Sequence, residues 1–130
     1  MIAVDTNVLV RLLVNDDPAQ SPRAAALFAA EEVFIAKTVL LETEWVLRFS
    51  YDLPREAVGV AFERLASVSS VTLEDAETVR AALSAHAAGI DFADALHVAS
   101  ARGAARFVTF DKKLGGQAVR AKLPVAVDVS

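Results

Sequence analysis

The feature that most constrains the fold is the alternation of short apolar runs with longer segments of helical periodicity. Five short runs predict strands at residues 2–4, 33–36, 71–73, 106–110 and 125–127. The intervening segments predict helices at residues 7–14, 22–30, 38–51, 54–65, 76–88, 91–104 and 111–119. Strands that alternate with helices predict an α/β fold, with a parallel sheet covered by helices on both faces.

Polar residues, prolines and glycines predict where several of these helices begin and end. Ser21 and Pro22 predict a helix with Ser21 as its N-cap, and Thr38 predicts the N-cap of the next helix. Gly89 predicts the end of the helix that precedes it. We see no linker or repeat, so residues 1–130 are expected to form a single domain.

Composition narrows the class of protein. Hydrophobic residues make up 55% of the 130-residue chain, which is enough for a substantial core. No apolar run is long enough to span a bilayer, so we expect no membrane association. The absence of cysteine excludes disulfides and thiolate metal sites and fits a cytoplasmic protein.

The net charge of −4 argues against a protein that coats nucleic acid, but the charge is unevenly distributed. Residues 102–130 hold six basic and two acidic side chains, a net charge of +4, and the rest of the chain carries −8. This basic segment could hold a polyanion near an acidic site, or it could be an ordinary solvated surface.

Two acids follow predicted strands directly. Asp5 follows the first strand and Asp111 follows the fourth. Because ligands of open α/β sheets gather at the carboxyl ends of the strands, both side chains are candidates for one site. An acid in this position can also serve only as the N-cap of the next helix.

Glu42 is a third candidate, on the predicted helix face that also carries Val39, Val46 and Phe49. It has no basic residue three or four positions away, and an ionised carboxylate that is buried needs a metal, a base or a raised pKa. Glu44 has Arg48 at i+4 and is expected to form a surface ion pair instead. An acid at the rim of an amphipathic helix remains an alternative for Glu42.

Asp91 and Asp94 lie on one face at the start of a predicted helix. Asp91 suits the N-cap, whereas Asp94, one turn further, is less needed for capping. His97 lies one turn beyond Asp94 and is interpreted as structural rather than as a metal ligand. His86 lies near a helix C-terminus, where a cation is favourable.

Taken together, the order and spacing of these acids resemble those of the PIN domain, and most closely those of its VapC-type toxin branch. The resemblance rests on Asp5-Thr6-Asn7 after the first strand, Glu42 in the run 39–42, Asp94 in the run 91–96, and Asp111 in the run 108–111. It covers essentially the whole chain. It implies a three-layer fold with a central parallel sheet of about five strands, and a metal-dependent endoribonuclease. It further implies a homodimer that a VapB-like antitoxin neutralises.

The resemblance carries Asp5, Glu42, Asp94 and Asp111 over as an acidic catalytic pocket. Asp5 and Asp94 would be the principal metal ligands, with Glu42, Asp111 and Asp91 in second rank. Thr6, Asn7 and Thr109 would be supporting polar residues. Arg11, Lys112 and Lys113 are candidates for contact with RNA.

Clustered carboxylates repel one another and need a counter-charge, which a hard divalent cation supplies. Oxygen ligands favour Mg²⁺, with Mn²⁺ able to replace it, over zinc. We hypothesise that a metal-activated water hydrolyses the RNA phosphodiester.

Two alternatives remain open at this point. One is a Mg²⁺-dependent phosphoryl-transfer enzyme that forms an aspartyl-phosphate at Asp5. The haloacid-dehalogenase pattern, however, requires an aspartate where this chain has Asn7. The other is a binding module that keeps the PIN fold without catalysis, although such a scaffold has no use for clustered acids.

Overall fold

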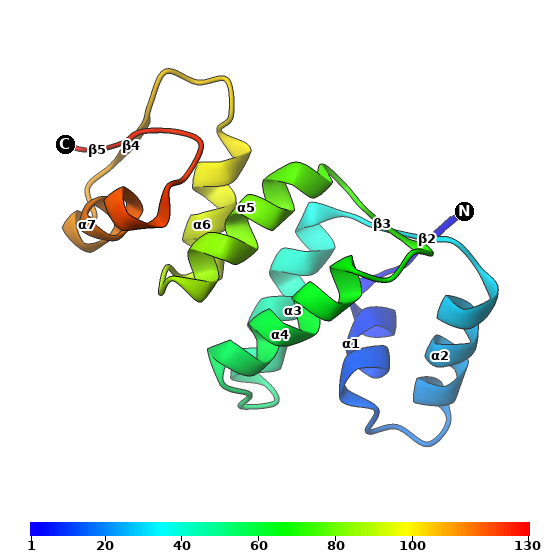
Figure 1. Cartoon of the computed structure of the whole chain (residues 1–130). Coiled ribbons are helices and arrows are strands. Elements are labelled where there is room, and N and C mark those ends of the chain that lie inside the picture. Colours follow the sequence, from blue (N-terminus) through cyan, green and yellow to red (C-terminus); the bar gives the residue numbers. More distant parts are fainter. The chain divides into compact units, whose positions relative to one another are not determined.

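The computed structural model describes residues 1–130, which form two compact units, residues 1–74 and 75–130. Unit 1 contains β1 (Ile2–Ala3), α1 (Thr6–Val14), α2 (Gln20–Ala30), β2 (Val33–Ile35), α3 (Lys37–Phe49), α4 (Arg55–Ala66) and β3 (Val71–Leu73). Unit 2 contains α5 (Ala76–Ala87), α6 (Phe92–Ser100), β4 (Phe107–Thr109), α7 (Lys112–Ala121) and β5 (Val127–Val129). Figure 1 shows these elements, and their alternation confirms the predicted α/β class.

All five predicted strands are present, and all their pairings are parallel. They form a three-stranded sheet in the order β1-β2-β3 and a two-stranded sheet of β4 and β5, rather than one ladder of five. Each strand is only two or three residues long. In unit 1, β2 is the middle strand; its Val33 and Ile35, which point to one face of the sheet, are fully buried, and Phe34 on the other face is half-buried.

The last strand begins later than predicted, at Val127 instead of Val125. Val125 is buried but precedes the ladder. The ladder starts where the Phe107 N–H donates to the Ala126 carbonyl at 2.8 Å, which pairs Phe107 with Val127. Burial of Val125 thus comes from packing and not from strand pairing.

Helix α3 buries a different face from the one predicted. Its buried side chains are Leu40, Thr43, Glu44 and Leu47, whereas Glu42 is exposed. Glu44 forms the predicted i+4 ion pair with Arg48, but the expectation of a surface pair was wrong because Glu44 is only 2% exposed. Two apolar stripes run along this helix, and the one that contains leucines packs inward.

Two predicted N-caps in unit 1 were also wrong. Helix α2 begins before Ser21, and the Asp17 carboxylate accepts the N–H groups of Ala19 and Gln20 at 2.9 and 2.7 Å. Helix α3 begins at Lys37, one residue before Thr38, and the Lys37 N–H donates to the Glu74 carboxylate at 2.8 Å. Both helices therefore use an acid outside the helix for capping.

In unit 2, α5 and α6 pack against each other as a helical hairpin (Figure 1). Gly89 ends the turn after α5 with a φ of 112°, a conformation that favours glycine, as predicted. His86 is buried, with its ring edge-on to Phe92 at 5.8 Å between centroids. Helix α6 stops at Ser100, earlier than the predicted residue 104, and Gly103 follows with a φ of 95°.

Helix α7 lies close to β5 at Gly115. A Cβ atom at Gly115 would lie 2.2 Å from the Cγ2 atom of Val129, closer than two carbons can approach. The structure shows that Gly115 allows the helix to contact the strand, whereas Gly116 has no neighbour within 4 Å.

Candidate active site

Asp5 lies at the point where β1 gives way to α1. It is the N-cap of α1, and its carboxylate accepts the Thr6 N–H at 2.8 Å. The side chain is nevertheless exposed, so capping leaves much of the carboxylate accessible. Asp5 can therefore serve both as a helix cap and as an oxygen ligand, the two roles that the sequence left open.

Glu42 is held from across the unit by Thr6. The buried Thr6 hydroxyl donates a hydrogen bond to Glu42 Oε1, which links the first turn of α1 to α3. Asp5 and Glu42 line the same open pocket of about 350 Å³. Its complete lining is Asp5, Thr6, Asn7, Val10, Arg11, Glu42, Val46 and Tyr51.

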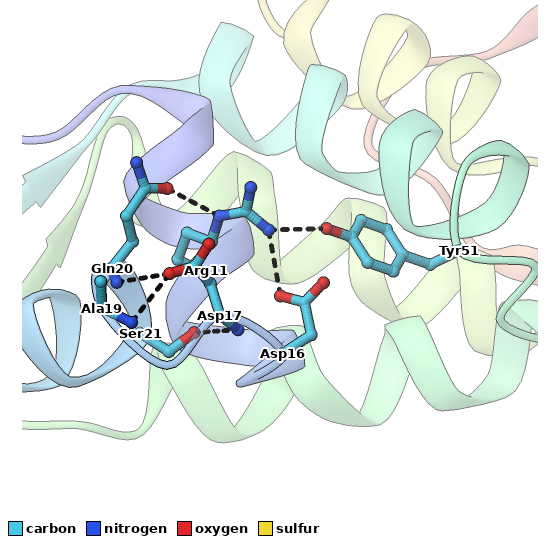
Figure 2. Close-up of polar contacts among 7 residues, drawn as sticks. All are labelled: Arg11, Asp16, Asp17, Ala19, Gln20, Ser21 and Tyr51. Carbon is cyan, nitrogen blue, oxygen red and sulfur yellow. Dashed lines mark hydrogen bonds and ion pairs between the residues drawn. The ribbon is translucent and has the colours of Figure 1, made fainter.

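Arg11 is fixed in this pocket by three hydrogen bonds. Its Nε donates to Gln20 at 2.9 Å, and its Nη1 donates to Asp16 at 3.0 Å and to the Tyr51 hydroxyl at 3.1 Å (Figure 2). The bond to Asp16 and the nearby negative groups raise the pKa of Arg11, so the guanidinium is permanently charged. Asp16 offsets part of that charge.

Tyr51 was missed by the sequence reasoning. It is the only tyrosine in the chain, and it follows α3, the helix that carries Glu42. Its hydroxyl contacts a residue 40 positions earlier, and local spacing cannot reveal such a contact. The one signal in the sequence that could have pointed to Tyr51 was its place just beyond the helix that carries the candidate acid Glu42.

In unit 2, Asp94 lies near two other acids. Partial burial raises the pKa of Asp94 above its ordinary value, and the negative charges of Asp91 and Asp111 raise it further. His97 opposes these effects, as the last of the contributions. Asp91 is the N-cap of α6, as the sequence suggested, and its carboxylate accepts the Asp94 N–H at 3.4 Å.

Asp111 is the N-cap of α7, and its carboxylate accepts the N–H groups of Lys113 and Leu114 at 3.0 and 3.2 Å. The Thr109 hydroxyl accepts the Asp111 N–H at 3.0 Å, so Thr109 lies directly beside this acid. Lys112 and Lys113 are exposed in the first turn of the helix. Two basic side chains therefore flank the one acid that caps this helix.

Each unit contains part of the predicted set of catalytic acids. Asp5 and Glu42 share a pocket in unit 1, and Asp94 interacts with Asp91 and Asp111 in unit 2. Nowhere in residues 1–130 do three or more histidine, cysteine or acidic side chains gather closely enough to hold a metal ion. A catalytic pocket of four acids thus remains a prediction.

Parallel strands with acids at their carboxyl ends define this chain as an α/β protein with carboxylate sites at its strand ends. The PIN domain family model matches residues 2–118, which span both units and all four acids. The chain therefore belongs to the PIN domain family, and the resemblance to that family is confirmed.

Among solved structures, the chain is similar to the crystal structure of Mycobacterium tuberculosis VapC20, described as a Sarcin-Ricin loop cleaving toxin. The two are 23% identical, with a TM-score of 0.46, over 89% of this chain and 94% of that one. No curated protein sequence matches the chain. None of its helices is long and apolar enough to cross a membrane.

Proposed function

We propose that this protein is a metal-dependent endoribonuclease that hydrolyses RNA phosphodiester bonds with Asp5, Glu42, Asp94 and Asp111. The observation that carries the proposal is the open pocket of unit 1, in which Asp5 and Glu42 lie beside hydroxyl and amide groups. Membership of the PIN family supports the addition of Asp94 and Asp111 to this pair.

The donor atoms in both units fit a hard divalent cation. The pocket of unit 1 offers carboxylate oxygens, the Thr6 hydroxyl and the Asn7 amide, with no thiol or imidazole in its lining. Mg²⁺ and Mn²⁺ prefer such oxygen ligands, whereas zinc favours sulfur and nitrogen. Asp5 and Asp94 would hold the ion, with Glu42, Asp111 and Asp91 in second rank. A bound divalent cation supplies an activated water and neutralises charge on the phosphoryl group.

The chain's own residues position these acids. The Thr6 hydroxyl fixes one oxygen of Glu42, which leaves the other oxygen available to a water or an ion. In unit 2 the backbone N–H groups of α7 and the Thr109 hydroxyl orient Asp111. Burial raises the pKa of Asp94, and the negative charges of Asp91 and Asp111 raise it further; a cation would relieve the repulsion among the three acids.

Basic side chains would hold the RNA. Lys112 and Lys113 stand next to Asp111, and Arg11 lines the pocket of Asp5. Following the resemblance to VapC-type proteins, we also propose a cytoplasmic homodimeric toxin that a VapB-like antitoxin neutralises. In this proposal, residues 1–130 act as a single PIN domain.

The test is cleavage of RNA by the full chain with Mg²⁺, with Mn²⁺ and with EDTA. We expect metal-dependent cutting that Asp5→Asn abolishes while the fold is retained. Asp52→Asn is the matched control, because Asp52 is an exposed acid of unit 1 in a left-handed conformation that asparagine tolerates. Undiminished cutting by the Asp5→Asn variant would overturn the proposal, as would a stable phosphate adduct on Asp5.

A further inference from the structure

A second pocket in unit 1 adjoins the pocket of Asp5 and Glu42, and the two share Asn7 and Arg11. It lies between α1 and α2, which pack side by side (Figure 1), and has a volume of about 190 Å³. Its lining is Asn7, Val8 and Arg11 from α1, and Gln20, Arg23, Ala24 and Leu27 from α2. We call this the α1–α2 cleft.

The lining of the α1–α2 cleft contains two guanidinium groups, two amides and no carboxylate. Arg23 is exposed and takes part in no ion pair or hydrogen bond. Two like charges that face one pocket repel each other, and the side chain of Asp16 compensates only Arg11. The cleft therefore has the composition of an anion-binding site.

Arg11 is prepared to bind such an anion. Gln20, Asp16 and Tyr51 hold its Nε and Nη1, and Figure 2 shows the remaining guanidinium nitrogen with no dashed line to any neighbour. That nitrogen keeps its two N–H donors for a ligand. Because the rest of the group is already fixed, binding there costs little side-chain entropy.

We propose that the α1–α2 cleft binds a backbone phosphate of the RNA strand, one that neighbours the scissile phosphate, between Arg11 and Arg23. This inference rests on the proposed ribonuclease function and adds a subsite to it. Asn7 and Arg11 border both pockets, so a strand with its scissile phosphate at Asp5 can continue into the cleft. The two arginines would contact the phosphate and not the base, so this contact does not depend on the RNA sequence.

The experiment measures binding of a labelled single-stranded RNA to the full chain in EDTA, between 50 and 200 mM KCl. For Arg23→Ala we expect roughly five- to tenfold weaker binding at 100 mM salt. We also expect the slope of log K against log[salt] to become shallower by about 0.7, the value for one phosphate contact on a single strand. Arg23→Lys should keep the slope, because it keeps the charge.

Arg64→Ala is the matched control. Arg64 is another exposed arginine of unit 1 without a side-chain partner, on α4 and outside both pockets. It should leave affinity and slope unchanged. Equal effects of Arg23→Ala and Arg64→Ala, or no effect of Arg23→Ala, would overturn the proposal, as would failure of the unmodified protein to bind RNA.

A second measurement locates the phosphate. In a series of RNAs, each with one uncharged methylphosphonate linkage, one position should weaken binding to the unmodified protein and should weaken binding to Arg23→Ala by a smaller factor, because only Arg11 then contacts that phosphate. Additive losses at every position would contradict a contact in the cleft. If the protein nevertheless cuts RNA in a metal-dependent way, the proposed ribonuclease function is still supported. Binding that depends on Arg23 without any cutting would support the cleft and overturn the function.

Discussion

Glu42 of unit 1 and the capping acids of unit 2 are held in different ways. In unit 1, Glu42 depends on a hydroxyl 36 residues away, donated by Thr6 from another helix. In unit 2, Asp91 and Asp111 cap their own helices and accept N–H groups within three residues. Tertiary packing therefore fixes Glu42 of unit 1, whereas local backbone geometry fixes Asp91 and Asp111 of unit 2, and also Asp5 of unit 1.

The two units also differ in how the negative charge of their acids is compensated. The pocket of Asp5 and Glu42 contains Arg11, whose guanidinium is anchored on three sides. Burial raises the pKa of Asp94, the negative charges of Asp91 and Asp111 raise it further, and His97 opposes these effects only in part. The site in unit 2 thus has the greater need of an added cation.

Gly115→Ala tests the local support in unit 2 and should have the largest effect. Its Cβ atom would overlap Val129, so α7 must move away from β5, at a cost of about 1–3 kcal/mol in the free energy of unfolding. Gly116→Ala, with no neighbour within 4 Å, should instead stabilise α7 by about 0.5–1 kcal/mol. Chemical denaturation measures both. Equal stabilities of the two variants would mean that the contact with Val129 does not constrain α7.

Thr6→Val tests the long-range support in unit 1. It removes the hydroxyl that fixes Glu42 and keeps most of the side-chain volume, so metal affinity and cleavage should fall about 10- to 100-fold, as for other groups that orient a ligand. Thr6→Ser keeps the hydroxyl and should retain most of the activity. Titration of Mn²⁺ by calorimetry, alongside the cleavage rate, measures the difference. Wild-type affinity in Thr6→Val would show that Glu42 needs no such partner.

The same contrast explains what could be predicted from the sequence. Strands, helices and the acids at strand ends follow from periodicity and from capping rules over a few residues, and Asp5, Asp91 and Asp111 do cap helices. The cap supplied by Glu74, the buried face of α3 and the contact of Tyr51 with Arg11 depend on packing. Local patterns do not contain that information, because several faces or partners satisfy them equally well.

Substitution of Asp94 should have the smallest effect on stability. The negative charge of Asp94 opposes folding of unit 2. Its pKa is raised in the folded chain, so the folded state binds the proton more tightly than the unfolded state does. Stability should therefore fall as the pH rises from the ordinary carboxyl pKa through the raised one, and the loss should persist at neutral pH.

Asp94→Asn should remove this pH dependence and, without metal, raise the melting temperature slightly at pH 7 while abolishing cleavage. Mg²⁺ should stabilise the unmodified protein more than the variant, because bound cations favour the state that holds them. Thermal melts between pH 4 and 8, with and without Mg²⁺, measure both effects. If Asp94→Asn melts lower than the unmodified protein at pH 7 without metal, repulsion among these acids is not what distinguishes the second unit from the first.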